Sequence, residues 1–253
     1  IKEMSVRLTE GEEKTLITKV LLPAGEHQLR IGNSNIVKVY VFAHRPVDLS
    51  RQVFGEYCSA RARPYEVKID RKNNRYMIKA AGTDFFHGED SYATAYLKKP
   101  IKGNFVATVK VVKYGPGTHE WYRTGLFVRN NITKSYDTGE GSLGSVLLFV
   151  SPGRAGMDWD EHGDGCMHKA SSQNHPVYEP TPMWIRLVRH GNSFSGYVSY
   201  DGVNWTVSRH TEDIPGIEDA VHLGLAAGGP DEKQYTVWFE DFNLEVENSK
   251  NKD

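Results

Sequence analysis

Apolar and polar residues alternate along much of this chain, as they do in strands that bury one face. In 104–113 every second residue is apolar, namely Phe105, Ala107, Val109 and Val111. A period of two residues predicts a half-buried β-strand, whereas a helix would repeat every three or four residues. No segment keeps a helical period for more than a turn or two. The pattern therefore predicts an all-β protein.

The segment 183–206 shows this pattern most clearly. Runs of strand-forming residues over 184–188 and 194–200 are separated by a glycine-containing turn, and Asp201-Gly202 forms a second turn. Glycine supplies the positive φ that such turns need. We expect three antiparallel strands joined by two tight turns.

Similar runs recur at high density through the rest of the chain. The strands they predict are 65–70, 76–81, 121–130, 144–151 and 156–162. Such a succession of strands and turns favours two packed antiparallel sheets. The polar segment 163–182 is long for a loop, and long loops in compact domains often bind ligands.

The first part of the chain is organised differently. Strand-like runs at 14–22, 26–31 and 36–43 predict a small β-meander within 1–50. Three short strands do not enclose a core, so we expect the meander to pack on the sandwich or to end a preceding β-domain. The proline-containing stretch 45–63 is predicted to be a linker, and 64–247 to be the sandwich.

Five motifs also carry a family resemblance. They are WIRLVRHGNSFSGYVSYDGVNW at 184–205, GTDFF at 82–86 followed by Asp90, WYRTGLFVR at 121–129, HLGLA at 222–226 and FEDF at 239–242. Together they resemble a bacterial, secreted branch of the concanavalin A-like lectin/glucanase superfamily, similar to the C-terminal domain of some β-xylosidases. The resemblance covers about 65–247 and implies a jelly-roll sandwich.

Composition and charge exclude several classes of function. A formal net charge of −1 gives no field that would attract nucleic acid. No run of about 18 apolar residues predicts a membrane span. Phosphate-binding loops, dinucleotide fingerprints, nucleophile elbows and zinc-protease motifs are absent. Cys58 and Cys166 are the only cysteines, so one disulfide is possible.

The stretch 156–162 holds the most reactive side chains. As a strand it would place Asp158, Asp160 and His162 on one face. That face is interpreted as a sugar-binding row or a solvated surface. Alternatively it resembles the carboxylate strand of the superfamily's glucanases, although a histidine at the third position departs from that pattern, and it resembles a calcium loop only weakly.

A second candidate face lies on 121–129. Trp121, Arg123 and Arg129 would share it, either as ion pairs or as a sugar platform, with the indole stacking on a sugar ring and the guanidinium groups donating hydrogen bonds. The other strand tryptophans are interpreted as core because their neighbours are β-branched or aliphatic, and these are Trp184, Trp205 and Trp238. The resemblance implies a structural calcium ion near Asp241.

We therefore expect a secreted module, extracellular or periplasmic, that binds a polysaccharide or oligosaccharide without cleaving it and that belongs to a larger parent protein. No cofactor is expected beyond the calcium ion. Two alternatives stay open: a glycoside hydrolase that uses Asp158 and Asp160, and a structural domain that supports a neighbouring catalytic domain.

Overall fold

The computed structural model describes residues 25–29, 37–41, 44–82, 84–85, 89–115, 121–135, 141–167, 169–170, 175–176, 181–229 and 233–247. They belong to two units, 1–43 and 44–253. In the first unit, β1 (Gly25–Leu29) pairs antiparallel with β2 (Val37–Val41). These two strands begin within one residue of the starts of the predicted runs 26–31 and 36–43. The third predicted strand, 14–22, lies outside the described residues.

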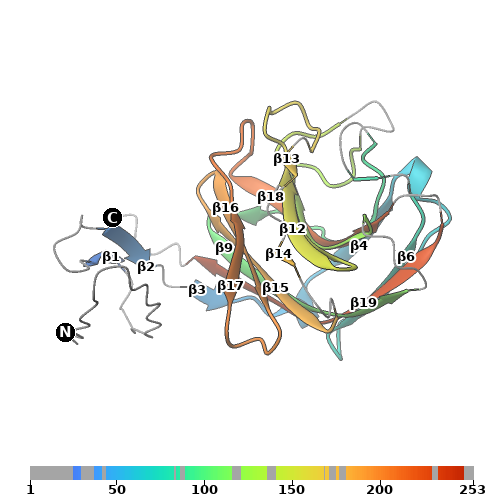
Figure 1. Ribbon diagram of the computed structural model, residues 1–253, viewed down its shortest axis with the longest axis horizontal. Coiled ribbons are helices and arrows are strands. Elements are labelled where there is room, and N and C mark those ends of the chain that lie inside the picture. The colour runs from blue at the N-terminus through green and yellow to red at the C-terminus, as the bar shows by residue number, and fades with distance from the viewer. Residues whose placement is uncertain are drawn as a thin grey trace, which may run out of the picture. The chain divides into compact units, whose positions relative to one another are not determined.

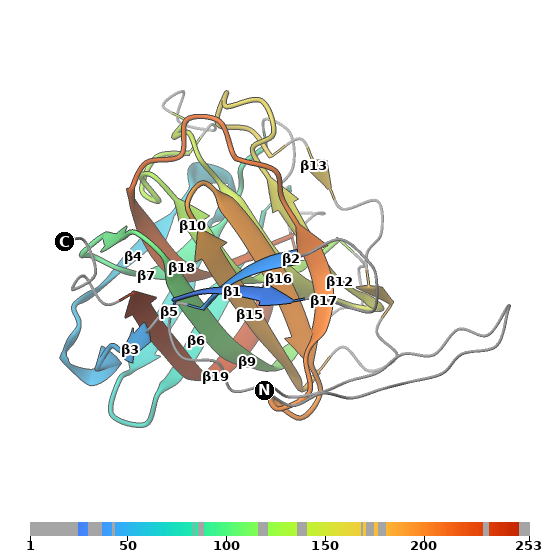
Figure 2. The ribbon, with the colours of Figure 1, turned by 90° about the vertical axis from the view of Figure 1, so that its left-hand side faces the viewer.

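The second unit is a sandwich of two antiparallel sheets (Figures 1 and 2). In spatial order the nine-stranded sheet contains β13 (Lys169–Ala170), β12 (Arg154–Trp159), β11 (Val146–Ser151), β10 (Arg123–Arg129), β18 (Ala220–Gly228), β7 (Ala93–Leu97) and β4 (Phe54–Cys58). Two short strands complete it: β14 (His175–Pro176) pairs with β12, and β8 (Ile101–Lys102) pairs with β18.

The eight-stranded sheet forms the other layer. Its order is β17 (Thr206–His210), β16 (Ser193–Ser199), β15 (Met183–His190), β9 (Phe105–Gly115), β19 (Tyr235–Glu247), β6 (Arg75–Ala80) and β5 (Glu66–Asp70), with β3 (His44–Pro46) paired to β19. Among the described residues the helical elements are two 3-10 turns, η1 (Leu49–Arg51) and η2 (Ala60–Ala62). The predicted all-β sandwich is confirmed.

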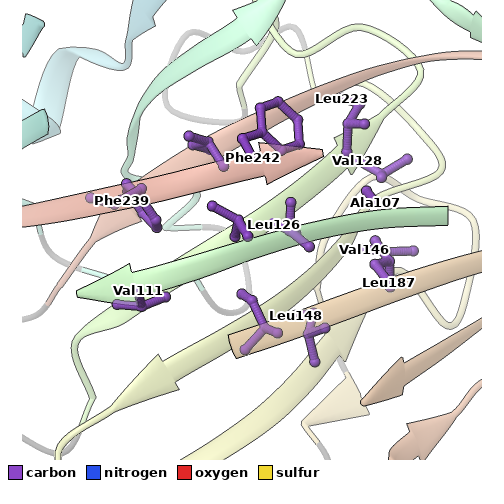
Figure 3. Packing of buried hydrophobic residues seen from close by; sticks show 14 of the residues in the cluster. Ala107, Val111, Leu126, Val128, Val146, Leu148, Leu187, Leu223, Phe239 and Phe242 are labelled. Carbon is purple, nitrogen blue, oxygen red and sulfur yellow. The ribbon is translucent and has the colours of Figure 1, made fainter. Parts of the chain in front are cut away.

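The core lies between the two sheets, where the alternating apolar residues meet (Figure 3). Ala107 and Val111 of β9 belong to this core with Leu126 of β10 and Leu148 of β11, and all four side chains are fully buried. In β9 the polar residues between them, Thr108 and Lys110, are only half-buried, so the period of two sets which face of this strand is buried.

The nine-stranded sheet is buried on its other face too. A second apolar cluster there is formed by side chains of the sheet, such as Phe127 and Phe149, and by side chains of the segments between strands, namely Phe85, Ile132 and Met167. We call this side the loop-covered face. The burial of every residue of β10 follows from cover on both sides.

Close packing makes one glycine of this sheet irreplaceable. A Cβ atom at Gly125, in the middle of β10, would lie 2.0 Å from the Leu148 carbonyl oxygen of the neighbouring strand. Real carbon and oxygen atoms do not approach so closely, so only glycine fits between these two strands.

Two predictions about the fold are wrong. The stretch 45–63 is not a linker, because it supplies β4, which pairs with β7, and most of β3, which pairs with β19. The sandwich unit therefore begins at position 44. The tryptophans assigned to the core, Trp184, Trp205 and Trp238, are only half-buried. Trp184 and Trp238 alternate with the core residues of their strands, whereas Trp205 directly precedes β17 and lies between exposed residues. Cationic side chains cover their rings instead.

Both cysteines are buried thiols. The Cys58 thiol donates a hydrogen bond to the Ser59 carbonyl oxygen over 3.3 Å. The disulfide that the sequence allowed between Cys58 and Cys166 is therefore not formed.

Candidate functional site

Strand β10 places both of its arginines on one face, as its alternation predicts. Leu126 and Val128 belong to the core between the sheets, whereas Arg123, Phe127 and Arg129 lie on the loop-covered face. Both guanidinium groups are almost completely buried, so each needs anionic or carbonyl partners inside the protein.

Arg123 lies between two carboxylates. Its Nε donates to Asp158 Oδ2 on β12 over 2.7 Å, and its Nη1 donates to Asp84 Oδ1 in the segment before β7. The Asp158 side chain is buried, whereas that of Asp84 is 27% exposed. This triad, Asp84–Arg123–Asp158, therefore reaches from the interior of the loop-covered face to solvent.

Asp158 is the most perturbed acid of the site. Burial raises its pKa from 3.8 to about 6, against the opposing effect of the Arg123 charge and hydrogen bond. Within the described residues its second oxygen, Oδ1, has no hydrogen-bond partner. A buried carboxylate with only one oxygen bonded prefers to bind a proton, which explains the direction of the shift.

An aromatic side chain stands beside the triad. Trp121, which precedes β10, is 38% exposed. The Arg154 guanidinium carbon lies 3.8 Å from the centroid of its ring, and that of Arg123 lies 5.3 Å away. Both guanidinium groups also approach the buried ring of Phe149, at 5.6 Å for Arg123 and 6.0 Å for Arg154. An exposed indole is thus held beside fixed charges.

Arg129, at the far end of β10, has a different environment. Its Nη1 lies 2.6 Å from Asp90 Oδ2 and 3.2 Å from the Tyr92 hydroxyl. Its Nε donates to the Ser142 carbonyl over 3.0 Å, and its Nη2 donates to the Gly165 carbonyl over 2.7 Å. Arg129 thereby ties three separate segments to the sheet, and the sugar contact predicted for it stays a prediction.

Asp160 binds backbone groups of the loop that it opens. Its carboxylate accepts hydrogen bonds from the backbone N–H groups of Gly144 (3.2 Å), Gly163 (2.7 Å), Asp164 (3.1 Å) and Gly165 (2.9 Å). The side chain is completely buried. Such a carboxylate organises a loop, because each donor would otherwise lie near a low-dielectric interior without a partner.

The strand predicted over 156–162 is too long, since β12 ends at Trp159. Asp158 and Asp160 do lie opposite the core residues Met157 and Trp159, as the alternation predicts. Their partners differ, however, and His162 is exposed on the loop beyond. The structure brings Trp121, Arg123 and Asp158 together, while Arg129, Asp160 and His162 lie outside that group.

Two residues of the site were missed from the sequence. Asp84 belongs to the GTDFF motif, so the motif itself was the available signal, although only the structure shows that it pairs with Arg123. Arg154 had no signal, because an arginine that follows a Pro-Gly turn resembles any solvated hairpin residue.

Asp241 lies at an irregularity of β19. Its φ is +54°, and the pairing of β19 with β9 shifts between Glu240 and Asn243. Its backbone N–H donates to the Asn74 carbonyl, and its own carbonyl accepts from Asn243 Nδ2. Within the described ranges no three His, Cys, Asp or Glu residues gather as a metal-binding group. The calcium ion stays a prediction.

A search of the described segments finds no helix long and apolar enough to cross a membrane.

Comparisons with known proteins support the fold. No protein-family model and no curated protein matches the chain. A functionally unknown protein from Saccharomyces cerevisiae is similar in structure, with a TM-score of 0.57 and 18% identity over 80% of this chain and 99% of that one. At this identity the similarity shows a shared fold.

Two further structures are more distant. The xylan β-1,4-xylosidase from Bacillus halodurans C-125 has a TM-score of 0.47 and 10% identity, over 72% of this chain and 38% of the xylosidase. The exoplasmic/lumenal domain of VIP36, in its Ca²⁺- and mannose-bound form, has a TM-score of 0.46 and 8% identity, over 78% of this chain and 85% of that domain.

Proposed function

We propose that the sandwich unit is a non-catalytic carbohydrate-binding module that holds a sugar beside Trp121. One observation carries the proposal: a partly exposed indole stands next to the guanidinium groups of Arg154, at 3.8 Å, and Arg123, at 5.3 Å, and Arg123 in turn binds the partly exposed carboxylate of Asp84. A sugar presents an apolar C–H face and several hydroxyl groups, so it binds where an aromatic plane and fixed polar groups converge.

Each residue of the site has a distinct role in this proposal. Trp121 stacks on the sugar ring, and Asp84 and Arg154 exchange hydrogen bonds with its hydroxyl groups. Arg123 and Asp158 support the site from below, in the protein interior. Their 2.7 Å contact fixes the Arg123 guanidinium group, and this group also binds Asp84 and so fixes its position. Preorganised polar groups lose little side-chain entropy on binding.

The sequence resemblance extends the proposal to the parent protein. The concanavalin A-like motifs are typical of secreted proteins that handle polysaccharides, so we place the module outside the cytoplasm, in a larger protein whose other domains are its neighbours. Function remains with the site rather than with the fold, which hosts binding, hydrolytic and structural domains alike.

The hydrolase alternative requires Asp158 and Asp160 to act together. Asp160 accepts four backbone hydrogen bonds, which favours a role in holding the loop. Asp158 is a better candidate than Asp160 for a general acid, since burial raises its pKa to about 6, near the range that general acids use. Its carboxyl group faces Arg123, which favours the ion pair over proton transfer to a ligand.

The experiment incubates the purified protein with insoluble and soluble polysaccharides, and it scores both the protein retained and the reducing sugar released. Retention without release, weakened about ten-fold by Trp121→Ala, is the expected result. Tyr200→Ala is the matched control, because Tyr200 is another exposed aromatic side chain, in the turn after β16. Retention that Trp121→Ala leaves unchanged would refute the site.

Release of reducing sugar that Asp158→Asn abolishes in a folded protein would establish the hydrolase instead. Neither retention nor release would favour a structural domain for a neighbouring catalytic unit.

A structural calcium ion at Asp241 is a further part of the proposal, supported by the sequence resemblance alone. Calcium that binds only the folded state raises the melting temperature. We expect this increase in the unmodified protein and not in Asp241→Asn, because asparagine keeps the left-handed backbone conformation and lacks the charge. Equal melting curves with calcium and with a chelator would refute the ion.

A further inference from the structure

A second group of ligand-binding side chains lies on the other layer of the sandwich. The face of the eight-stranded sheet that points away from the core carries a groove of about 360 Å³, within the size range of small-ligand pockets. It is lined by Val106, Thr108, Arg186, Val188, Tyr197, Trp205, Asn243 and Glu245. Every one of these side chains is half-buried or exposed.

The strand register arranges four of these residues in a row. Tyr197 of β16 lies opposite Arg186 of β15, Arg186 lies opposite Thr108 of β9, and Thr108 lies opposite Asn243 of β19. Because neighbouring strands are about 4.8 Å apart, the row is about 14 Å long and runs across the sheet. A linear ligand fits such a row when it lies across the strands.

A second row makes the floor beside it. Val188 lies opposite Val106, and Val106 lies opposite Glu245. The groove therefore offers aliphatic surface along one side and hydrogen-bonding groups along the other.

Trp205 covers the arginine of the first row. The Arg186 guanidinium carbon lies 3.9 Å from the Trp205 ring centroid, and Arg186 Nε donates to the Thr108 hydroxyl over 3.3 Å. These two contacts hold the guanidinium group in place, so that it presents its remaining donors at a fixed position.

Several polar groups of the groove are not used by the protein itself. Among the described residues, the terminal nitrogens of Arg186, the Tyr197 hydroxyl and the Glu245 carboxylate have no hydrogen-bond partner. The loop-covered face differs in this respect, since Arg129 and Asp160 make four hydrogen bonds each there. Donors and acceptors in the groove are available to a ligand.

The charge of the groove selects the class of ligand. Its lining holds one cation, Arg186, and one carboxylate, Glu245. An anionic polymer would meet the carboxylate, and a purely apolar peptide would leave the hydrogen-bonding capacity of both charged groups unused. A neutral chain rich in hydroxyl groups satisfies both.

We propose that this groove binds a neutral polysaccharide chain that lies across strands β16, β15, β9 and β19, with a sugar ring against Tyr197 and Trp205. The proposal is independent of the site beside Trp121. If both are correct, the sandwich contacts carbohydrate on two opposite faces, and bivalent binding increases the affinity for an extended polymer.

The five tryptophans of the chain allow a direct test. Each indole N–H gives its own signal in a ¹H–¹⁵N spectrum, and single Trp→Phe variants assign the signals. The protein is titrated with xylohexaose, cellohexaose, mannohexaose and laminarihexaose, and separately with polygalacturonate. We expect a neutral hexasaccharide to shift the Trp205 signal saturably and to leave the Trp238 signal in place.

Variants locate the response. Tyr197→Ala and Glu245→Gln, at half-buried and exposed positions, should each weaken the binding seen at Trp205, Tyr197→Ala by about ten-fold. Trp238→Ala is the matched control, because that ring also lies under a cation, Lys113 at 4.5 Å, but outside the groove. Trp121→Ala should leave the Trp205 response unchanged, which separates the two sites.

Three results would overturn the proposal. They are the absence of a Trp205 response to all four neutral hexasaccharides, a response to polygalacturonate alone, and a Trp205 shift that depends on protein concentration without sugar. The last of these would identify a second copy of the chain as the occupant.

Discussion

The Arg129 guanidinium group lies 2.6 Å from the Asp90 carboxylate, and both side chains are buried. Six positions earlier in each segment, Arg123 pairs with Asp84, whose side chain is 27% exposed. Two arginines of β10 thus fix the segment before β7 onto the loop-covered face. The geometry explains why the two motifs that carry these residues occur together in one chain.

Removing the buried pair should destabilise the fold. Asp90→Asn leaves the Arg129 charge buried without its anion, so we expect the free energy of unfolding to fall by about 3–5 kcal/mol. Urea denaturation followed by tryptophan fluorescence measures this change. Glu89→Gln is the matched control, because its ion pair with Arg61 is half exposed and should contribute no more than about 1 kcal/mol. Equal losses in the two variants would contradict the assignment.

Asp158 should make stability depend on pH. Because burial raises its pKa from 3.8 to about 6, the folded protein binds this proton more tightly than the unfolded chain does. Its contribution to stability is therefore complete below about pH 3.8 and is lost as the pH rises through about 6, by roughly 3 kcal/mol.

Unfolding free energies measured at several pH values between 3.5 and 7.5, for the unmodified protein and for Asp158→Asn, isolate this effect from that of the other carboxylates. The difference between the two proteins should change across that range, in favour of the unmodified protein at low pH. A difference that stays constant with pH would exclude the raised pKa.

Asp160 should stabilise the fold through the loop that its carboxylate binds. Asparagine at this position keeps one acceptor oxygen for four backbone donors, so Asp160→Asn should lower the free energy of unfolding by about 2–3 kcal/mol. The denaturation midpoint in urea reports the loss. His162→Ala, on the same loop but exposed, should change stability by less than about 0.5 kcal/mol. If Asp160→Asn left the free energy of unfolding unchanged, Asp160 would again be a candidate catalytic acid.

Gly125 should tolerate no side chain. Gly125→Ala forces β10 and β11 apart at the centre of the nine-stranded sheet, so we expect a loss of more than about 3 kcal/mol or failure to fold, measured as thermal midpoint and soluble yield. At Gly153 a Cβ would meet nothing, and only the φ of +79° opposes alanine there, at about 1 kcal/mol. Similar midpoints for the two variants would be inconsistent with the 2.0 Å approach.

The sequence predicts the strands of the sandwich well where one face is buried. In β9 the apolar residues occupy every second position because the core requires them there, so periodicity alone identifies both the strand and its buried face. The same period identifies the core-facing residues of β15, and it places Trp184, the neighbour of Ile185, on the outward face.

The stretch 45–63 was misjudged because its glycine and proline look like loop residues. Gly55 nevertheless lies inside β4, where a Cβ would lie 2.7 Å from the end of the Tyr96 ring. Pro46 is accepted because it ends β3, which pairs with a single neighbour, β19. The candidate site was harder still, since the two carboxylate partners of Arg123, Asp84 and Asp158, come from separate segments whose approach no local pattern records.

The pairing of β3 with the end of β19 brings the two ends of the sandwich unit together, with His44 opposite Glu247. A unit whose ends adjoin can be inserted into a surface loop of a host protein without stretching either chain. It can also be circularly permuted: a short glycine-rich connection from 247 to 44 and new termini at the exposed Gly191-Asn192 turn should give a protein with the same two sheets.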